Sequence, residues 1–171
     1  MMKISTGLKF AAVATALFLS ACTDKPKAVE TAPPPGDTTT SSTTSSIIPG
    51  SAEDLKVNVG DTVHFDYDQY AVTDEGKTTL QRQAAWLAKY PSVRITVEGH
   101  CDERGTREYN LALGARRANA VKEYLVSLGV SSGRLDTISY GKERPICTES
   151  DESCWAQNRR GVSTVTGGAS S

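Results

Sequence analysis

A stretch of threonine, serine and proline near the start of the chain limits how much of it can fold. Residues 31–46 read TAPPPGDTTTSSTTSS, and 13 of these 16 residues are Thr, Ser or Pro. Such a stretch cannot bury enough apolar surface to offset the entropy of an ordered chain, so we expect it to be disordered. The whole chain has 171 residues. The 125 residues that follow this stretch suit one domain of ordinary size.

The segment before this stretch has the three parts of a bacterial export signal. Two early lysines give a positive start, residues 10–19 form an apolar run, and Ser20 and Ala21 supply small residues before Cys22. The apolar run has ten residues, about half of the ~20 that a membrane-spanning helix needs. We therefore predict a cleaved signal peptide over residues 1–21.

The residues around Cys22 resemble a lipobox, in which the cysteine becomes the first mature residue and is acylated. A simple signal peptide followed by a chance cysteine is the alternative. Each buried methylene of an acyl chain contributes about 0.8 kcal/mol, and two chains hold a protein stably where one does not. Thr23 follows the cysteine. By resemblance to enterobacterial sorting rules, it predicts the periplasmic face of the outer membrane of a Gram-negative bacterium. The tether would then span residues 22–54.

The charge of the chain argues against nucleic-acid binding. The sequence has 19 basic and 20 acidic side chains, a net charge of -1. Removal of residues 1–21 takes away two lysines and no acids, which leaves 17 basic and 20 acidic side chains and a net charge of -3. Non-specific binding to nucleic acid needs an excess of basic charge, so we expect no nucleic-acid partner.

Residues 55–166 alternate between strand-like and helix-like patterns and predict one α+β domain. Strands are predicted where apolar and polar residues alternate or form short apolar runs, at residues 63–67, 93–99, 135–140 and 161–166. Thr73 and Thr106 are the predicted caps of two helices between them. The order β-α-β-α-β-β indicates one mixed four-stranded sheet with helices on one face. Residues 167–171 would form a disordered tail.

Each predicted helix has an apolar stripe that should face the core. In the first helix the stripe consists of Leu80, Ala84 and Leu87. In the second it consists of Leu111, Gly114, Ala118, Val121, Leu125 and Leu128. Gly129 follows at the position where a helix often ends on glycine.

The densest polar stretch, residues 99–110, joins the second predicted strand to the longer helix. Such a junction suits a ligand site, because rigid elements hold an exposed loop. Asp102 lies in this loop, while Asn110, Leu113 and Arg117 share one face of the helix. A carboxylate and a guanidinium facing one pocket would suit a zwitterion. Alternatively, Asp102 and Arg117 pair with each other and staple the loop, and the residues alone leave both interpretations open.

Three enzyme interpretations are weaker. Neighbouring strand residues point to opposite faces, so His100 cannot easily act as a base for Cys101. His64 and His100 are the two histidines, and neither a His-x-x-x-His nor a Cys-x-x-Cys spacing supports a metal site. No spacing favours the carboxylate pair of a glycosidase. We therefore expect no catalytic residue, metal or cofactor.

Four motifs resemble those of outer-membrane-protein-A-like (OmpA-like) domains, and the resemblance extends in register over residues 55–166. These motifs are residues 99–106 (GHCDERGT), residues 110–118 (NLALGARRA), Phe65-Asp66-Tyr67-Asp68 and Asn158-Arg159-Arg160. The resemblance implies a domain that binds the meso-diaminopimelate of the peptidoglycan stem peptide without turning it over.

The resemblance also implies which residues form the site. Asp102 and Arg117 would be the main ligands of the diaminopimelate, and Asn110 and Leu113 would shape the pocket. The end of the first strand would form the pocket wall, with Phe65, Asp66, Tyr67 and Asp68.

The partners implied by the resemblance belong to the cell envelope. They are peptidoglycan, the outer membrane through lipid on Cys22, and the Tol proteins through the propeller protein TolB during constriction at division. An envelope hydrolase acting on peptidoglycan is the competing class of function.

The four cysteines fit an exported protein. Cys147 and Cys154 bracket a short acidic loop, and in an oxidising periplasm they can form a disulfide. Two exposed free thiols are the alternative. With Cys22 lipidated, Cys101 would remain unpaired and half-buried at the end of a strand.

Overall fold

The computed structural model describes residues 47–169. The predicted signal peptide, Cys22 and most of the predicted tether lie outside these residues and stay predictions. Within the described part of the chain, every helix is too short or too polar to cross a membrane.

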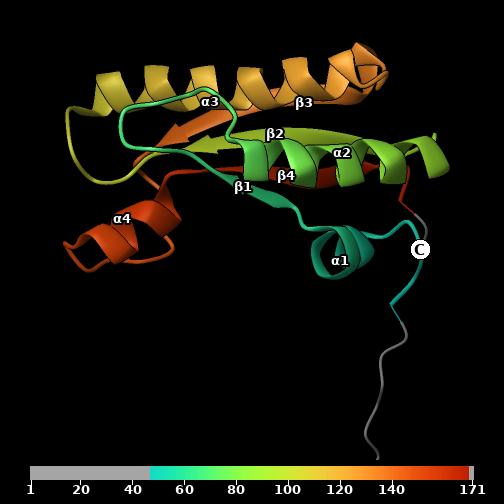
Figure 1. Cartoon of the computed structure of the whole chain (residues 1–171), viewed down its shortest axis with the longest axis horizontal. Helices are drawn as coiled ribbons and strands as arrows, with labels where there is room; N and C mark the ends of the chain where they lie inside the picture. The colour runs from blue at the N-terminus through green and yellow to red at the C-terminus, as the bar shows by residue number, and fades with distance from the viewer. Residues whose placement is uncertain (1–46, 170–171) are drawn as a thin grey trace, which may run out of the picture. The chain divides into compact units, whose positions relative to one another are not determined.

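Four strands form one sheet in the order β1-β4-β2-β3 (Figure 1). They are β1 (Thr62–His64), β2 (Arg94–His100), β3 (Leu135–Gly141) and β4 (Arg160–Gly167). β2 and β3 are parallel, whereas β4 is antiparallel to both β1 and β2. The predicted mixed four-stranded sheet is therefore confirmed.

The first strand is shorter than the sequence predicts. The pattern favoured residues 63–67, but β1 ends at His64. The amide of Gln69 donates to the carbonyl of Asp66 at 3.2 Å, and Asp68 has a φ of 58°, the one positive φ among the described non-glycine residues. The chain thus turns directly after the strand, because the backbone of this segment makes contacts outside the sheet, described below.

Both long helices begin at the predicted caps. The Thr73 hydroxyl accepts from the amide of Gly76 at 3.1 Å and starts α2 (Asp74–Lys89). The Thr106 hydroxyl accepts from the amide of Tyr109 at 3.2 Å and starts α3 (Arg107–Ser127). Each cap satisfies an amide that has no acceptor within its own helix.

Both helices contribute to one core with the sheet. The predicted stripe of α2 is buried, as are Ala118, Val121 and Leu125 of α3. Leu128 departs from the prediction and is 39% exposed. The chain reverses at Gly129, which has a φ of 94°, and Val130 is buried in place of Leu128.

Ordered structure begins before residue 55, the predicted domain start. A short helix, α1 (Ala52–Asp54), leads into one π-helical turn, η1 (Leu55–Val59). The buried Asp54 carboxylate accepts from the Trp86 indole at 2.9 Å and from the Gly50 amide at 2.8 Å. The Trp86 contact attaches the segment to α2, 32 residues later in the chain.

Two short helical segments were not predicted from the sequence. One is the 3-10 turn η2 (Ser132–Arg134), and the other is α4 (Glu152–Asn158), between β3 and β4. Asp151 caps α4 by accepting from the Cys154 amide at 2.9 Å. The helix has only seven residues, so it offers too little periodicity for a sequence pattern to reveal it.

The closest approach between a helix and the sheet requires two glycines. A Cβ on Gly99 of β2 would lie 1.8 Å from the carbonyl oxygen of Gly114 in α3. A Cβ on Gly114 would lie 2.3 Å from the Ser139 hydroxyl. α3 can therefore lie this close to β2 and β3 only because Gly99 and Gly114 have no side chains.

We predict that Gly99→Ala lowers the free energy of unfolding by about 2–3 kcal/mol, because α3 must move away from β2. Chemical denaturation measures this change. Gly133→Ala is the matched control, since its Cβ meets only the Ser131 hydroxyl at 3.9 Å. Equal stability of the two variants would contradict the tight contact.

Candidate functional site

A cavity of about 290 Å³ opens where β2 passes into α3. Two carboxylates and two guanidiniums contribute to its lining, together with aromatic, apolar and amide side chains. The lining consists of Tyr67, Asp68, Cys101, Asp102, Arg104, Gly105, Tyr109, Asn110, Leu113 and Arg117. The predicted main ligands, Asp102 and Arg117, therefore lie in one cavity.

Arg117 is 0% exposed and donates to three backbone carbonyls in two other segments of the chain. Its guanidinium donates to the carbonyl of His100 at 2.8 Å, of Gln69 at 2.8 Å and of Asp66 at 3.1 Å. Burial lowers the pKa of this guanidinium, although an arginine stays protonated at any physiological pH. Arg117 thus joins α3 to the end of β2 and to the turn after β1.

Asp102 bonds to other arginines and not to Arg117. Its carboxylate accepts from the Arg104 side chain at 2.6 and 3.2 Å and from Arg159 at 3.4 Å. Burial alone raises the pKa of this carboxyl, but the hydrogen bonds from Arg104 outweigh burial and leave the pKa below its usual value. The staple between Asp102 and Arg117, considered above as an alternative, does not form.

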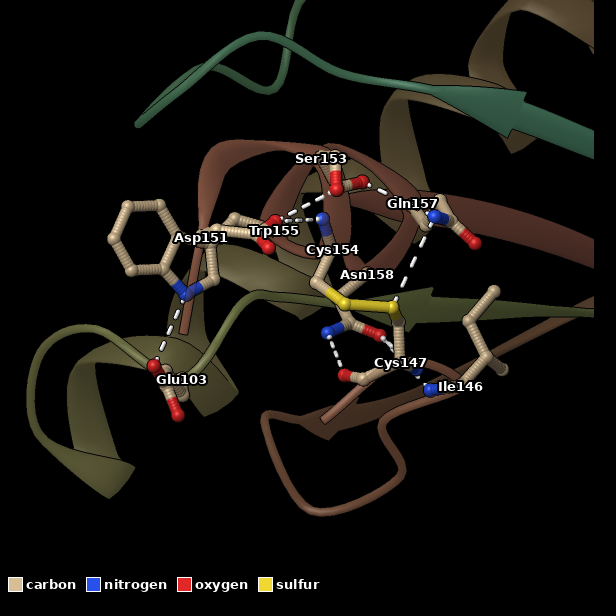
Figure 2. Close-up of a disulfide and its surroundings, with 9 residues drawn as sticks. All are labelled: Glu103, Ile146, Cys147, Asp151, Ser153, Cys154, Trp155, Gln157 and Asn158. Atoms are coloured by element: carbon tan, nitrogen blue, oxygen red, sulfur yellow. Dashed lines mark hydrogen bonds between the residues drawn. A yellow bond between two sulfur atoms is a disulfide. The ribbon is translucent and has the colours of Figure 1, made fainter. Parts of the chain in front are cut away.

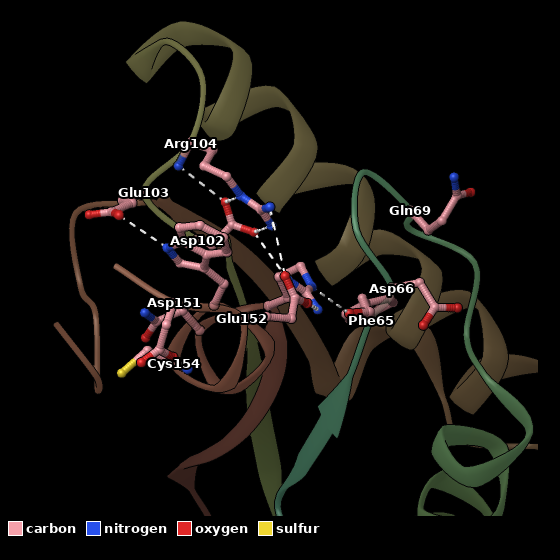
Figure 3. A network of polar contacts seen from close by, with 12 residues as sticks. Phe65, Asp66, Gln69, Asp102, Glu103, Arg104, Asp151, Glu152 and Cys154 are labelled. Atoms are coloured by element: carbon pink, nitrogen blue, oxygen red, sulfur yellow. Dashed lines mark hydrogen bonds and ion pairs between the residues drawn. The ribbon is translucent and has the colours of Figure 1, made fainter. Parts of the chain in front are cut away.

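Arg104 lies between two aromatic rings at the edge of the cavity. Its guanidinium carbon is 4.1 Å from the centre of the Tyr67 ring and 4.1 Å from that of Trp155. A guanidinium stacks favourably on aromatic faces while its N–H groups bond in its own plane. Figure 3 shows Arg104 beside Asp102, with Glu152 of α4 nearby.

Tyr67 and Asp68 form one wall of the cavity, as predicted for the end of the first strand. The Tyr109 hydroxyl donates to the Asp68 carboxylate. Asp68 is exposed, whereas Asp102 is only 5% exposed. The cavity therefore combines one rigidly held carboxylate with one that is open to solvent.

Asn110 and Leu113 are buried and line the cavity. The Asn110 amide donates to the carbonyl of Arg104 at 2.8 Å and to that of Thr106 at 3.0 Å. These two bonds hold the loop before α3 in a closed turn.

Phe65 and Asp66 do not line this cavity, which corrects the prediction for the first half of their motif. The Phe65 ring is buried against the Arg117 guanidinium, 5.2 Å from ring centre to Arg117 Cζ. The backbone carbonyl of Asp66 accepts a hydrogen bond from Arg117. Asp66 also lines a second cavity, together with Arg159. Both residues therefore support the site by positioning Arg117.

Several residues of the site were not singled out by sequence reasoning. Arg104, Gly105 and Tyr109 lie within the polar stretch at residues 99–110, so their position was a usable signal. Glu152 and Trp155 come from α4, some 50 residues later in the chain. Only the tertiary structure brings α4 to the cavity.

The geometry does not support the enzyme interpretations that involve His100. Cys101 is buried, and its sulfur lies 3.4 Å from the carbonyl of Asn110. His100 is 2% exposed, and its nearest charged neighbour is Glu98, 3.4 Å from Nε2. Among residues 47–169, no three His, Cys, Asp or Glu side chains are grouped as metal ligands would be.

Cys147 and Cys154 form a disulfide, as the sequence predicted (Figure 2). Cys101 is the free cysteine among the described residues, and it is fully buried where the sequence suggested half-burial. The disulfide connects the loop after β3 to α4, next to the Trp155 indole, which donates to Glu103 at 3.0 Å.

The fold thus places a cavity with charged side chains in its lining where β2 passes into α3. Comparison with known proteins identifies the family: the model described as "OmpA family" matches residues 64–159, more than half of the chain. The chain belongs to the OmpA family. This membership makes it a structural binding protein and not an enzyme.

Individual relatives agree with this assignment. The peptidoglycan-associated lipoprotein of Agrobacterium fabrum is 50% identical over 169 residues, which cover 99% of this chain and 93% of that protein. The one from Rhizobium meliloti is 62% identical over 123 residues, 72% of this chain and 69% of that protein. The crystal structure of the one from Burkholderia pseudomallei is 44% identical, with a TM-score of 0.61, and covers 62% of this chain and 90% of that one.

We predict that Arg117→Ala lowers the free energy of unfolding by about 3 kcal/mol or more, because three backbone carbonyls lose their donor. Arg117→Lys should recover only part of this loss, since one ammonium cannot reproduce the planar fork of a guanidinium. The exposed neighbour Arg116→Ala is the control and should stay within about 0.5 kcal/mol of the parent. Denaturant titration of the three variants makes the measurement.

His100 should make stability depend on pH. Burial, and then the charge of Arg160, lower its pKa to about 4, against the attraction of Glu98; Tyr140 and Arg144 pack on the same side. The unfolded state takes up this proton near pH 6.5, so stability should fall as the pH drops from about 6.5 to about 4.

Thermal unfolding of His100→Gln across this pH range tests the assignment. The variant should show a flatter profile than the parent, because the residue no longer titrates. His64→Gln, which removes the exposed histidine of β1, should keep the slope of the parent. An unchanged slope in His100→Gln would show that another group is responsible.

Proposed function

We propose that this chain is an outer-membrane lipoprotein that binds peptidoglycan non-covalently and ties the outer membrane to the cell wall. The observation that carries the proposal is the cavity between β2 and α3, lined by two carboxylates and two guanidiniums in a domain of the OmpA family. Relatives named peptidoglycan-associated lipoprotein support it.

The ligand we propose is the free end of meso-diaminopimelate in the stem peptide, which carries an ammonium and a carboxylate. The charged residues that line the cavity, Asp68, Asp102, Arg104 and Arg117, sum to zero. A lining of this kind favours neither a simple anion nor a simple cation, and it complements a group that carries both charges.

The ammonium would bind between the Asp68 and Asp102 carboxylates. Asp68 is the more accessible of the two, because Asp102 already accepts from Arg104 and Arg159. Arg117 has five N–H groups and donates three hydrogen bonds to backbone carbonyls, so up to two N–H groups remain for the ligand carboxylate. Asn110 and Leu113 would limit the size of the group that enters.

The finer parts of the proposal concern the envelope. Acylation of Cys22 would anchor the chain, and the predicted tether would let the domain reach the wall. We propose TolB and other Tol proteins as partners during envelope constriction at cell division, as the resemblance to OmpA-like domains implies. Many repeated sites on the wall and a membrane anchor would together compensate for a modest affinity at each site.

The first test is co-sedimentation with purified sacculi. Asp102→Asn keeps the shape of the side chain but removes its charge, so binding should weaken about 10-fold or more, the value of one charge-assisted hydrogen bond. Asp136→Asn, on exposed β3, is the control and should sediment like the parent. Thermal unfolding of each variant separates lost binding from lost structure.

A titration with stem peptides tests the ligand. A peptide with meso-diaminopimelate should bind, while one with lysine at that position should bind more weakly, because it lacks the second carboxylate. A zymogram of the pure protein addresses the competing hydrolase function. Clearing of peptidoglycan, or equal binding of both peptides, would contradict the proposal.

A further inference from the structure

The disulfide belongs to a segment with few other attachments. Between β3 and β4, residues 148–153 are all exposed, and α4 has seven residues, too few for a helix to be stable alone. Cys147 and Cys154 tie the two ends of this loop together. The Asn158 side chain adds bonds to the Ile146 amide at 2.8 Å and to the Cys147 carbonyl at 2.7 Å (Figure 2).

Two side chains of α4 contact Arg104, which lines the cavity. The Trp155 ring covers one face of the guanidinium, and a Glu152 carboxylate oxygen lies 3.7 Å from Arg104 Nη1. The other oxygen of Glu152 lies 2.6 Å from Arg159. The indole N–H of Trp155 donates to Glu103, which fixes the ring.

Arg104 and Arg159 in turn hold Asp102. Both guanidiniums that contact α4 also donate to the Asp102 carboxylate. Arg104 does so at 2.6 Å (Figure 3), and Arg159 does so at 3.4 Å. The backbone amide of Arg104 adds a bond at 3.1 Å. A continuous path of contacts thus runs from the disulfide through α4 to the buried carboxylate of the cavity.

We propose that α4 is a positioning element for the binding site, and that the redox state of the Cys147–Cys154 disulfide controls ligand affinity through it. This inference rests on the proposed function. In the oxidised state the loop between the cysteines has few conformations, so α4 keeps Trp155 and Glu152 against Arg104. On reduction this exposed loop regains its conformational entropy, and Arg104 and Asp102 lose their fixed geometry.

The switching step is a thiol–disulfide exchange with a dithiol. The dithiol supplies two electrons and two protons and becomes a disulfide, while the S–S bond breaks and Cys147 and Cys154 each become a thiol. Cys101 takes no part, because burial raises the pKa of its thiol and a buried thiol is a poor nucleophile.

The test uses the full-length protein in detergent and a stem peptide that contains meso-diaminopimelate. Addition of a dithiol should raise the Kd by about 2- to 30-fold, the range expected for coupling through such contacts. A variant with Cys147→Ser and Cys154→Ser should show this raised Kd with and without the dithiol. An unchanged or lower Kd on reduction, or a parental Kd in the double variant, would overturn the inference.

Variants of α4 test the path without touching the disulfide. In the oxidised protein, Trp155→Ala should raise the Kd, while Trp155→Phe should restore most of the affinity because a ring again covers Arg104. Glu149→Gln, in the same loop, is the matched control and should bind like the parent. Equal binding by Trp155→Ala and the control would exclude α4 as a positioning element.

A ligand-independent measurement follows the two indole N–H signals by nuclear magnetic resonance. Reduction should shift or broaden the Trp155 signal and leave that of Trp86, which donates to the buried Asp54, unchanged. If the Trp155 signal stays in place, the inference fails even where peptide binding succeeds. If the oxidised parent binds no peptide, the proposed function fails, and with it this extension.

Discussion

The buried guanidinium of Arg117 is the interaction on which this end of the domain depends. It extends from α3 and donates to the backbone of two other segments, the turn after β1 and the last residue of β2. A backbone carbonyl that faces a buried side chain needs a donor, since an unsatisfied polar group costs free energy. The turn after β1 can leave the sheet early because Arg117 supplies those donors, and this departure places Tyr67 and Asp68 at the cavity.

A second set of charges completes the site from distant parts of the chain. Asp102 and Arg104 come from the loop before α3, whereas Glu152 and Arg159 come from α4 and the residue after it. Asp102 and Arg159 are buried, and a buried ion pair persists only where its hydrogen bonds are satisfied; Arg104 and the exposed Glu152 supply the further partners. The arrangement holds the Asp102 carboxylate in a fixed position in the cavity wall, so this side chain would not need to be ordered when a ligand binds.

Much of the fold was predictable because it rests on local patterns. Thr73 and Thr106 begin the two long helices, and the strand patterns correspond to the four strands of the sheet. Leu128 was misassigned because periodicity continued past the point where Gly129 reverses the chain. α4 was missed because seven residues carry almost no periodic signal. The predicted ligand residues Asp102, Asn110, Leu113 and Arg117 lie together in the cavity, whereas Phe65 and Asp66 contact Arg117 instead of lining it.

The sequence by itself determined the class of fold, the family motifs and the loop that carries Asp102, and it predicted the pairing of Cys147 with Cys154 without excluding two free thiols. Only the tertiary structure decided the partners of the charges. In the folded protein Arg117 donates to backbone carbonyls, and Asp102 accepts from Arg104 and Arg159. The physical reason is that helix and strand patterns depend on neighbours within a few residues. The partner of a buried charge depends on which segments packing brings within hydrogen-bond distance.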